Sequence, residues 1–150
     1  MAEAGLILIN LENGDAAFVF QFFPSSVSVT DRANWMAKET TIGVKPLFYA
    51  NREPRQIEFP ELHLDNTDTN ESLTSQIKEL RALLEETEKG TPPALLACWG
   101  DRQERSVLQE LAIQETFFNI DGEPIRVLIR MSLMQLQPEF GEATGVRVNE

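Results

Sequence analysis

Cysteine and histidine are almost missing from this sequence, which has one of each, Cys98 and His63, in 150 residues. A single cysteine excludes a disulfide within the chain, so the protein can mature in a reducing compartment. One imidazole and one thiol are too few for a recognisable transition-metal site. We therefore expect no bound metal, with His63 as an outward-facing strand residue and Cys98 as a small core group without nucleophilic function.

Motifs of catalysis and of cofactor binding are missing as well. The sequence has no glycine-rich loop of the kind that cradles phosphate. Asp65, Thr67 and Thr69 have the spacing that begins a calcium-binding EF-hand loop. However, the sixth loop position is not glycine, and Gln76 stands where the bidentate acid is needed. The sequence therefore predicts no enzyme activity, no catalytic residue and no cofactor.

Basic residues and long apolar runs are also scarce. There are 13 basic residues against 24 acidic ones, and the formal net charge of −11 opposes binding to phosphate backbones and to anionic membranes. No stretch approaches the roughly 20 apolar residues of a membrane-spanning helix. The N-terminal segment has neither the basic start nor the cleavage pattern of a signal peptide. We expect a soluble protein that binds neither nucleic acid nor membrane.

What the sequence does contain is a series of strand patterns. A length of 150 residues with 42% apolar and 25% charged residues is typical of one globular domain. Asn13-Gly14 lies between two apolar runs and predicts a hairpin, because both residues tolerate positive φ. Centring the turn there places Leu8 opposite Val19. Both faces of this hairpin are apolar, so we expect both to be covered.

The middle of the chain predicts a short strand, an extended arm and a kinked strand. Residues 27–29 alternate between apolar and polar, and the largely polar segment that follows contains Trp35. The segment 56–65 alternates before Pro60 and resumes with the opposite parity after it. A bulge at Pro60 explains this change of phase.

One helix and one buried strand come next. We expect the helix over residues 70–90, with Asn70 as its N-cap and Gly90 at its end. The nearly continuous apolar run at 93–100 predicts a strand that is buried on both faces. The apolar stripe of the helix recurs at intervals of 4, 3 and 4 and consists of Leu73, Ile77, Leu80 and Leu84.

The longest pattern is a hairpin over residues 107–136, whose turn centres on Asp121-Gly122. Alternation predicts one apolar face, with Ile113 opposite Ile129, and a second face of mixed polarity. At about 3.3 Å per residue its two strands span roughly 35 Å, close to the width of a domain of this size, so part of the hairpin should overhang. Such a strand pair invites aggregation unless copies of the protein or the single helix cover it. The pattern leaves both possibilities open.

Several landmarks occur in an order that resembles the tube-like domain of contractile injection systems and contractile phage tails. They are FQFFPSSVSV, NW, EPRQIEFPELHLD, a helix leading to PPALLACWG, and VLQELAIQETFFNIDGEPIRVLIRMSL. The most specific are the steps at Phe22–Pro24, Pro92–Gly100 and Phe118–Arg126. The resemblance covers residues 6–137. More narrowly, the chain looks like the family that forms the inner baseplate or tube-initiator ring, many members of which carry a lysin-motif domain after the tube domain.

The resemblance implies a mainly β fold with one helix (α+β), in which two packed antiparallel sheets form a tube-protein-like β-barrel or sandwich with a flanking helix. Residues 1–137 would be the tube-like β domain, and residues 138–150 a peripheral C-terminal tail. Six copies would form a hexameric ring whose sheets join around a lumen, between the spike hub and the inner tube. Because no lysin-motif segment follows the domain, we expect a ring-building function without peptidoglycan binding.

The resemblance also implies partners and a location. The partners are copies of the chain itself, the neighbouring ring, and the spike hub and inner tube proteins of the same particle. The location is the cytoplasm of the producing cell, within an assembled phage-tail-like particle. Two alternatives stay open: a monomeric β-barrel that binds a small molecule or sugar, and an assembly or terminator protein of the same tail. The first alternative requires a closed sheet with an enclosed cavity.

Two sets of residues are candidates for structural roles. For the aromatic residues, simple core packing is at least as good an explanation as a contact between subunits. For the arginines, the simple explanation is a cross-strand partner such as Glu110, worth under about 1 kcal/mol if exposed. The candidate interface or lumen residues are Trp35, Arg126, Leu128, Arg130 and Met134. The candidate structural anchors are Phe22, Pro24, Trp99 and Phe118.

Overall fold

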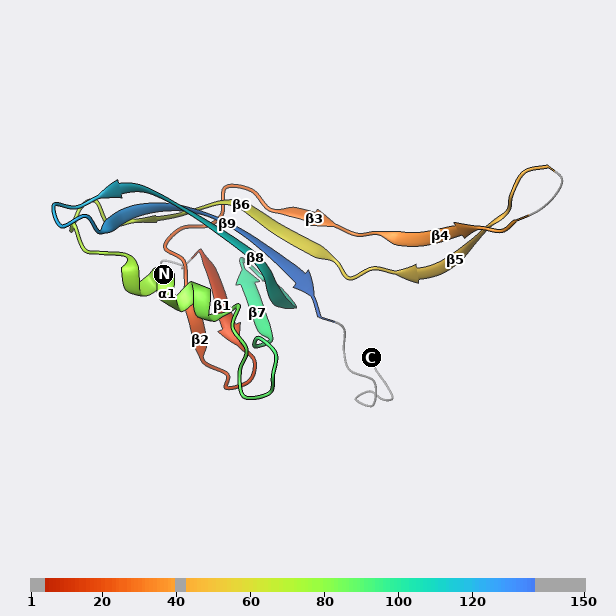
Figure 1. Ribbon diagram of the computed structural model, residues 1–150, viewed down its shortest axis with the longest axis horizontal. Coiled ribbons are helices and arrows are strands. Elements are labelled where there is room, and N and C mark those ends of the chain that lie inside the picture. The colour runs from red at the N-terminus through yellow and green to blue at the C-terminus, as the bar shows by residue number, and fades with distance from the viewer. Residues whose placement is uncertain (1–4, 40–42, 137–150) are drawn as a thin grey trace.

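A computed structural model describes residues 5–39 and 43–136 of the chain (Figure 1). Seven strands form one antiparallel sheet in the order β2-β1-β7-β8-β9-β6-β3, and two more form a separate antiparallel sheet, β4-β5. The prediction of a mainly β chain with one helix and two antiparallel sheets is confirmed, although the strands described here do not close into a barrel. The elements are β1 (Leu6–Asn10), β2 (Ala16–Val19), β3 (Ser28–Thr30), β4 (Ala33–Ala37), β5 (Leu47–Arg52), β6 (Gln56–Asp65), α1 (Thr74–Ala82), β7 (Leu95–Trp99), β8 (Arg102–Phe118) and β9 (Pro124–Gln135).

The first hairpin forms as the Asn-Gly signal predicts, but its register differs by one residue. Leu8 lies opposite Phe18, and not opposite Val19. The turn is wider than two residues, because the amide of Asn10 donates to the carbonyl of Asp15 (2.9 Å). Leu8 and Phe18 therefore share the core face, whereas Val19 is 48% exposed. The outer face of this hairpin is only partly covered, contrary to the prediction.

The core lies inside the curl of the seven-stranded sheet. β6 and β7 are not neighbours in the sheet, yet Phe59 and Trp99 pack edge to face with ring centroids 5.3 Å apart. The sheet therefore folds back on itself and brings the buried side chains of one face together. Leu73, Ile77 and Leu80 add the apolar side of α1 to this core and are at most 3% exposed. One twisted sheet and one helix thus enclose the interior.

The helix is shorter than its sequence pattern. It runs from Thr74 to Ala82 and not over 70–90. Asn70 does not cap it, because Asn70 has φ 60° in the preceding loop. Gly90 belongs to a later turn, in which its amide donates to the carbonyl of Thr87 (2.9 Å). Three glutamates between residues 85 and 88 would lie at the negative end of a longer helix, which disfavours its extension.

β7 alternates and is not buried on both faces. Leu95, Ala97 and Trp99 face the core and are at most 8% exposed. Leu96 and Cys98 are half-buried on the opposite face. The continuous apolar run of the sequence therefore belongs to a strand with one core face and one partly exposed apolar face, and the prediction of burial on both sides is wrong.

Two predicted features of the long strands are confirmed. The register between β6 and β9 shifts between Phe59 and Leu62, which places a bulge around Pro60. β8 and β9 pair along a long hairpin in which Ile113 lies opposite Ile129. β8 begins earlier than predicted, because its first residues pair with β7.

Residues 33–39 and 43–52 form an arm that projects far beyond the seven-stranded sheet (Figure 1). Its strands, β4 and β5, pair with each other and with no other described strand. At the root of the arm, Arg55 Nε donates to Asp31 Oδ1 (2.8 Å) and Arg55 Nη1 donates to Glu104 Oε2 (3.0 Å). Arg55 therefore connects the base of the arm to β8, and its hydrogen bond holds the pKa of Asp31 below the ordinary value.

Candidate assembly surfaces

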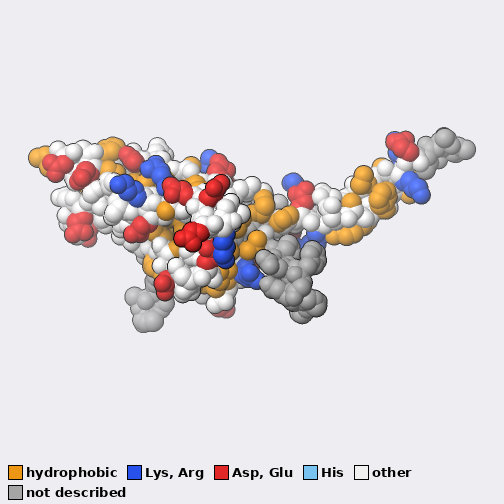
Figure 2. Space-filling view, turned by 60° about the horizontal axis from the view of Figure 1, so that its bottom comes forward, with side chains coloured by type: hydrophobic (Ala, Val, Ile, Leu, Met, Phe, Trp, Pro, Cys, Tyr) orange, Lys and Arg blue, Asp and Glu red, His pale blue; other side chains and the backbone are white. Residues whose placement is uncertain are grey.

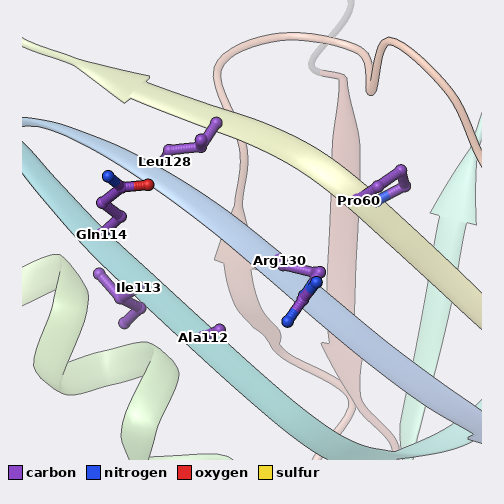
Figure 3. Close-up of a pocket in the computed structure, with 6 residues that line it drawn as sticks. All are labelled: Pro60, Ala112, Ile113, Gln114, Leu128 and Arg130. Carbon is purple, nitrogen blue, oxygen red and sulfur yellow. The ribbon is translucent and has the colours of Figure 1, made fainter.

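The outer face of the long hairpin is the side of β8 and β9 that points away from the core. Three of the predicted residues, Leu128, Arg130 and Met134, project from β9 on this face, between the buried positions of the strand. A shallow depression of about 310 Å³ on this face is lined by Pro60, Ala112, Ile113, Gln114, Leu128 and Arg130 (Figure 3). The structure thus brings the predicted β9 residues onto one surface, open to solvent and mixed in polarity.

The two predicted arginines have different surroundings. Arg126 Nε lies 3.3 Å from Asp65 Oδ2, and the guanidinium of Arg126 lies 4.4 Å from the ring centroid of Phe117. Its partner is therefore Asp65 on β6 and not Glu110. Arg130 lies opposite Ala112 and makes no salt bridge within residues 5–39 and 43–136. Of the two, Arg130 has the charge that is available to another molecule.

One edge of β8 is paired over only 5 of the strand's 17 residues. β7 pairs with its first part, Arg102–Ser106, while β9 pairs with its other side as far as Phe118. Among the described strands, none pairs with the β7 side of β8 from Val107 to Phe118. We call this stretch the open edge. The free N–H and C=O groups of such an edge are a template for a further strand.

The turn between β8 and β9 forms an exposed apolar end of the molecule. Phe117 and Phe118 are 51% and 52% exposed, and Ile120 is 98% exposed. We call residues 117–123 the hairpin end. Asn119 organises the turn, since its side-chain oxygen accepts from the amides of Asp121 (2.9 Å) and Glu123 (3.0 Å). The apolar side chains are therefore presented on an ordered loop.

The arm is apolar on both of its faces. Trp35 and Tyr49 pack edge to face on one side, with ring centroids 5.6 Å apart, and Met36 lies opposite Phe48 in the neighbouring pair. All four side chains are between 48% and 58% exposed, and the space-filling view shows hydrophobic side chains along the arm (Figure 2). Monomeric proteins rarely expose a contiguous surface of this kind unless it binds a partner. Trp35 thus lies on an exposed surface of the arm, and its role at an interface stays a prediction.

The four predicted anchors divide into two groups. Trp99 is 8% exposed and packs on Phe59, which makes it a core residue. Pro24 is half-buried. Phe22 and Phe118 are each more than half exposed, so a contact with another molecule is the anchoring role open to them. That role stays a prediction.

The single cysteine and the single histidine of the chain lie on different strands, β7 and β6. Burial raises the pKa of the Cys98 thiol, so Cys98 is a poor nucleophile at neutral pH. His63 is exposed on β6. No cluster of three or more His, Cys, Asp or Glu side chains in residues 5–39 and 43–136 could hold a metal ion. α1, the helix of the described part, is too short to cross a membrane.

A second cleft lies beside the start of β8. Its volume is about 650 Å³, and it lies between the loop before β7 and the chain around Leu136. The cleft is open on the surface and is not the enclosed interior of a barrel, which a monomeric binding module would require. Its lining comprises Leu11, Glu12, Lys89, Thr91, Pro92, Ala94, Arg105, Val107, Leu108 and Leu136.

The sequence pattern missed part of these surfaces. Local sequence patterns did not identify three apolar residues that are between 48% and 98% exposed: Phe48, Val44 and Ile120. A usable signal was present in the arm, because large apolar residues occupy successive positions at Leu47–Tyr49 and so cannot all face one core. The open edge had no such signal, because pairing with a distant strand is invisible in local alternation.

Comparison with known proteins gives one family. The model of the contractile injection system tube protein family matches residues 10–143, which is most of the chain. None of the curated proteins compared with the sequence is similar to it at a significant level. The match runs from the end of β1 to beyond β9 and so includes the arm, the helix and the long hairpin, and it agrees with the resemblance noted in the sequence. The chain therefore belongs to the contractile injection system tube protein family and is a component of a phage-tail-like particle.

Proposed function

We propose that six copies of this chain form a closed ring of the inner baseplate or tube-initiator type, which joins the spike hub to the inner tube. The observation that carries the proposal is the open edge of β8, where the free side of Val107–Phe118 has no partner strand among the described residues. Such a long free edge is an aggregation hazard in a monomer but a built-in contact in a closed ring.

Strand direction supports ring closure through this edge. β8, β9, β6 and β3 lie side by side and alternate in direction. Because the set has four members, its first and last strands run in opposite directions. The open edge of β8 in one copy can therefore meet the β3 side of the next copy as an antiparallel pair. Repeating this step around a rotation axis joins the sheets of all copies into one wall.

The outer face then lines the lumen. α1 and the core lie on one side of the joined wall, and the side chains of Leu128, Arg130 and Met134 lie on the other. This surface carries charges of both signs, from Arg130 on β9 and from Glu58 on β6. A mixed surface of this kind is wettable and has no strong field of one sign, which suits the passage of cargo. No catalysis is part of this function.

Electron microscopy of the purified particle tests the proposal. The particle is assembled in the cytoplasm of the producing cell, and the chain is expected as a six-copy ring between hub and inner tube. A position in the shaft or at the terminal end would replace the initiator assignment by that of a shaft or terminator protein. The proposal of a ring would be overturned if the purified chain stayed monomeric after hub and tube proteins were added and if it bound a sugar or small molecule.

A further inference from the structure

The cleft beside the start of β8 is continuous with the open edge. β7 pairs with β8 as far as Ser106, and the cleft opens beyond that pair. Val107 and Leu108 line the cleft and are also the first residues of the open edge. The chain beyond β1 forms another part of the wall, where the amide of Leu11 donates to the carbonyl of Ala94 (2.9 Å). A segment that lies in this cleft therefore covers the beginning of the open edge.

The cleft combines apolar walls with a basic rim. Six of the ten described residues that line it are apolar. Its charged residues are Arg105 and Lys89 against Glu12. Arg105 and Lys89 are exposed, and neither makes a salt bridge within residues 5–39 and 43–136. In a chain with a net charge of −11, this cleft attracts an acidic segment that also carries apolar side chains.

The last described residue lies at the wall of this cleft. Leu136 lines the cleft, and its amide donates to the carbonyl of Arg105 (2.8 Å). Residues 137–150 follow directly and lie outside the described residues. Attachment at this point gives them an effective concentration of about 1 mM in the cleft. A contact of modest affinity is therefore enough to keep the cleft occupied by this segment.

The composition of residues 137–150 complements the cleft. Three glutamates against one arginine give the segment a side-chain charge of −2, opposite in sign to the basic rim. Glu139 and Glu142 follow Leu136 by three and six residues, a reach of roughly 10 and 20 Å in an extended chain. The large apolar residues of the segment are Phe140, Val146 and Val148. The segment thus brings both acidic and apolar side chains within reach of the cleft at which it is attached.

We infer that residues 137–150 dock in this cleft of their own chain before assembly and cover the beginning of the open edge. Proteins commonly protect an exposed strand edge by covering it with a loop. In the proposed ring the same edge pairs with a neighbouring copy, so the segment leaves the cleft when the ring closes. The docking concerns the single chain, and only the displacement step rests on the proposed ring. The docked segment thus prevents edge pairing between free chains in the cytoplasm of the producing cell.

Charge reversal in the unassembled full chain tests the docking. One variant carries Lys89→Glu with Arg105→Glu, and the other carries Glu139→Lys with Glu142→Lys. Hydrogen exchange is measured at the amides of residues 107–108, one of which points to the open edge because successive N–H groups alternate. That amide is expected to exchange about tenfold faster in each variant. Combining all four substitutions restores slow exchange, because the charges of the segment and the cleft match again.

Two further variants serve as a control and as an uncharged test. Lys78→Glu with Arg81→Glu, on the exposed side of α1, is the matched control and should exchange like the unmodified chain. Val146→Ser with Val148→Ser removes apolar side chains from the segment without changing its charge. This variant should also speed exchange at the open edge, because an apolar cleft binds the serine side chains less well.

The outcomes separate the docking from the ring. Unchanged exchange in both charge variants, or no recovery in their combination, overturns the docking. Slow exchange that appears only at high protein concentration, or only after the hub protein is added, also overturns it, because the occupant is then a second copy or a partner. Both charge variants should form rings sooner than the unmodified chain, and equal rates overturn the displacement step. If the docking is observed but the unmodified chain forms no ring with hub and tube proteins, the proposed function fails alone.

Discussion

The curled sheet and the arm are both antiparallel β structure, but they bury their apolar side chains in different ways. In the curled sheet, Phe59 is fully buried against Trp99. In the arm, Phe48 has the same size and the same strand environment but is 48% exposed. Strand formation alone therefore does not produce a core, because burial depends on a second layer. The sheet obtains that layer from its own curl and from α1, whereas nothing in residues 5–39 and 43–136 covers the arm.

The largest expected effect is a difference in the free energy of unfolding when the same substitution, Phe→Ala, is made in the sheet and in the arm. Phe59→Ala removes a fully buried ring and should lower the free energy of unfolding by about 3–5 kcal/mol. Phe48→Ala is the matched change in the arm and should alter it by about 0.5 kcal/mol or less. Urea unfolding of the isolated chain measures both. Equal losses would mean that the arm packs on the sheet in solution.

Proline substitution tests whether the open edge is used for assembly. The N–H groups of Ile113 and Gln114 point to opposite sides of β8, because successive residues of a strand alternate. Of Ile113→Pro and Gln114→Pro, one loses a hydrogen bond to β9, and the other loses only a donor on the open edge. The variant whose free energy of unfolding is nearly unchanged should fold, but it should form no rings in electron micrographs. Normal rings from that variant would contradict edge pairing.

A smaller effect sharpens the assignment of the outer face. Leu128→Asp places a charge in the shallow depression beside Arg130. If this face lines the lumen, the variant should still form rings, and its unfolding free energy should change by about 1 kcal/mol or less. Size-exclusion chromatography and electron microscopy check the assembly. Loss of rings from a folded variant would show instead that a neighbouring subunit covers this face.

The smallest expected effect concerns the root of the arm. Arg55→Met removes both contacts of the guanidinium, with Asp31 and Glu104, and should speed amide exchange in β4 and β5 without unfolding the sheet. Arg52→Met is the matched control, because Arg52 is exposed and lies 3.8 Å from Asp31. Exchange that is equally fast in both variants would argue against a specific role for Arg55.

The contact between Arg55 and Asp31 makes the root of the arm sensitive to pH. Arg55 holds the pKa of Asp31 below its ordinary value in the folded state. The contribution of this pair is therefore complete above the ordinary aspartate pKa of about 3.9 and is lost as the pH falls through the lowered value. The amide chemical shifts of β4 and β5 should stay constant between pH 8 and 5 and change in stronger acid. In Asp31→Asn this change should be smaller.

Local signals predicted the hairpins and the bulge but not their exact registers. Asn13-Gly14 marks the first turn, yet the wider loop closed by Asn10 and Asp15 shifts the pairing by one residue. Pro60 marks the bulge correctly, because a change of parity within one strand needs an extra residue. The helix ends are the weakest part of the prediction, since leucine spacing continues beyond the residues that are helical.

The candidate surfaces could be predicted only in part. Alternation along β9 identifies Leu128, Arg130 and Met134 as one face, and the structure places them there. Exposure of Phe22 and Phe118 was not predictable, because an apolar side chain at a core and one at an interface have the same local pattern. The partner of Arg126 was also missed, because Asp65 is distant in sequence and reaches it only through the pairing of β6 with β9.

A bulge in β8 determines which side chains of this strand face the core of the subunit and which face the opposite side of the sheet. The register with β9 shifts between Leu108 and Glu110, so Gln109 is the extra residue. Leu108 faces the core before the bulge, and Leu111 and Ile113 do so after it. Leu108 and Leu111 are three residues apart, and regular alternation would place them on opposite faces, so the extra residue is what lets both face the core. One bulge residue thus decides, for the whole distal half of β8, which side chains point inward and which point toward the proposed channel.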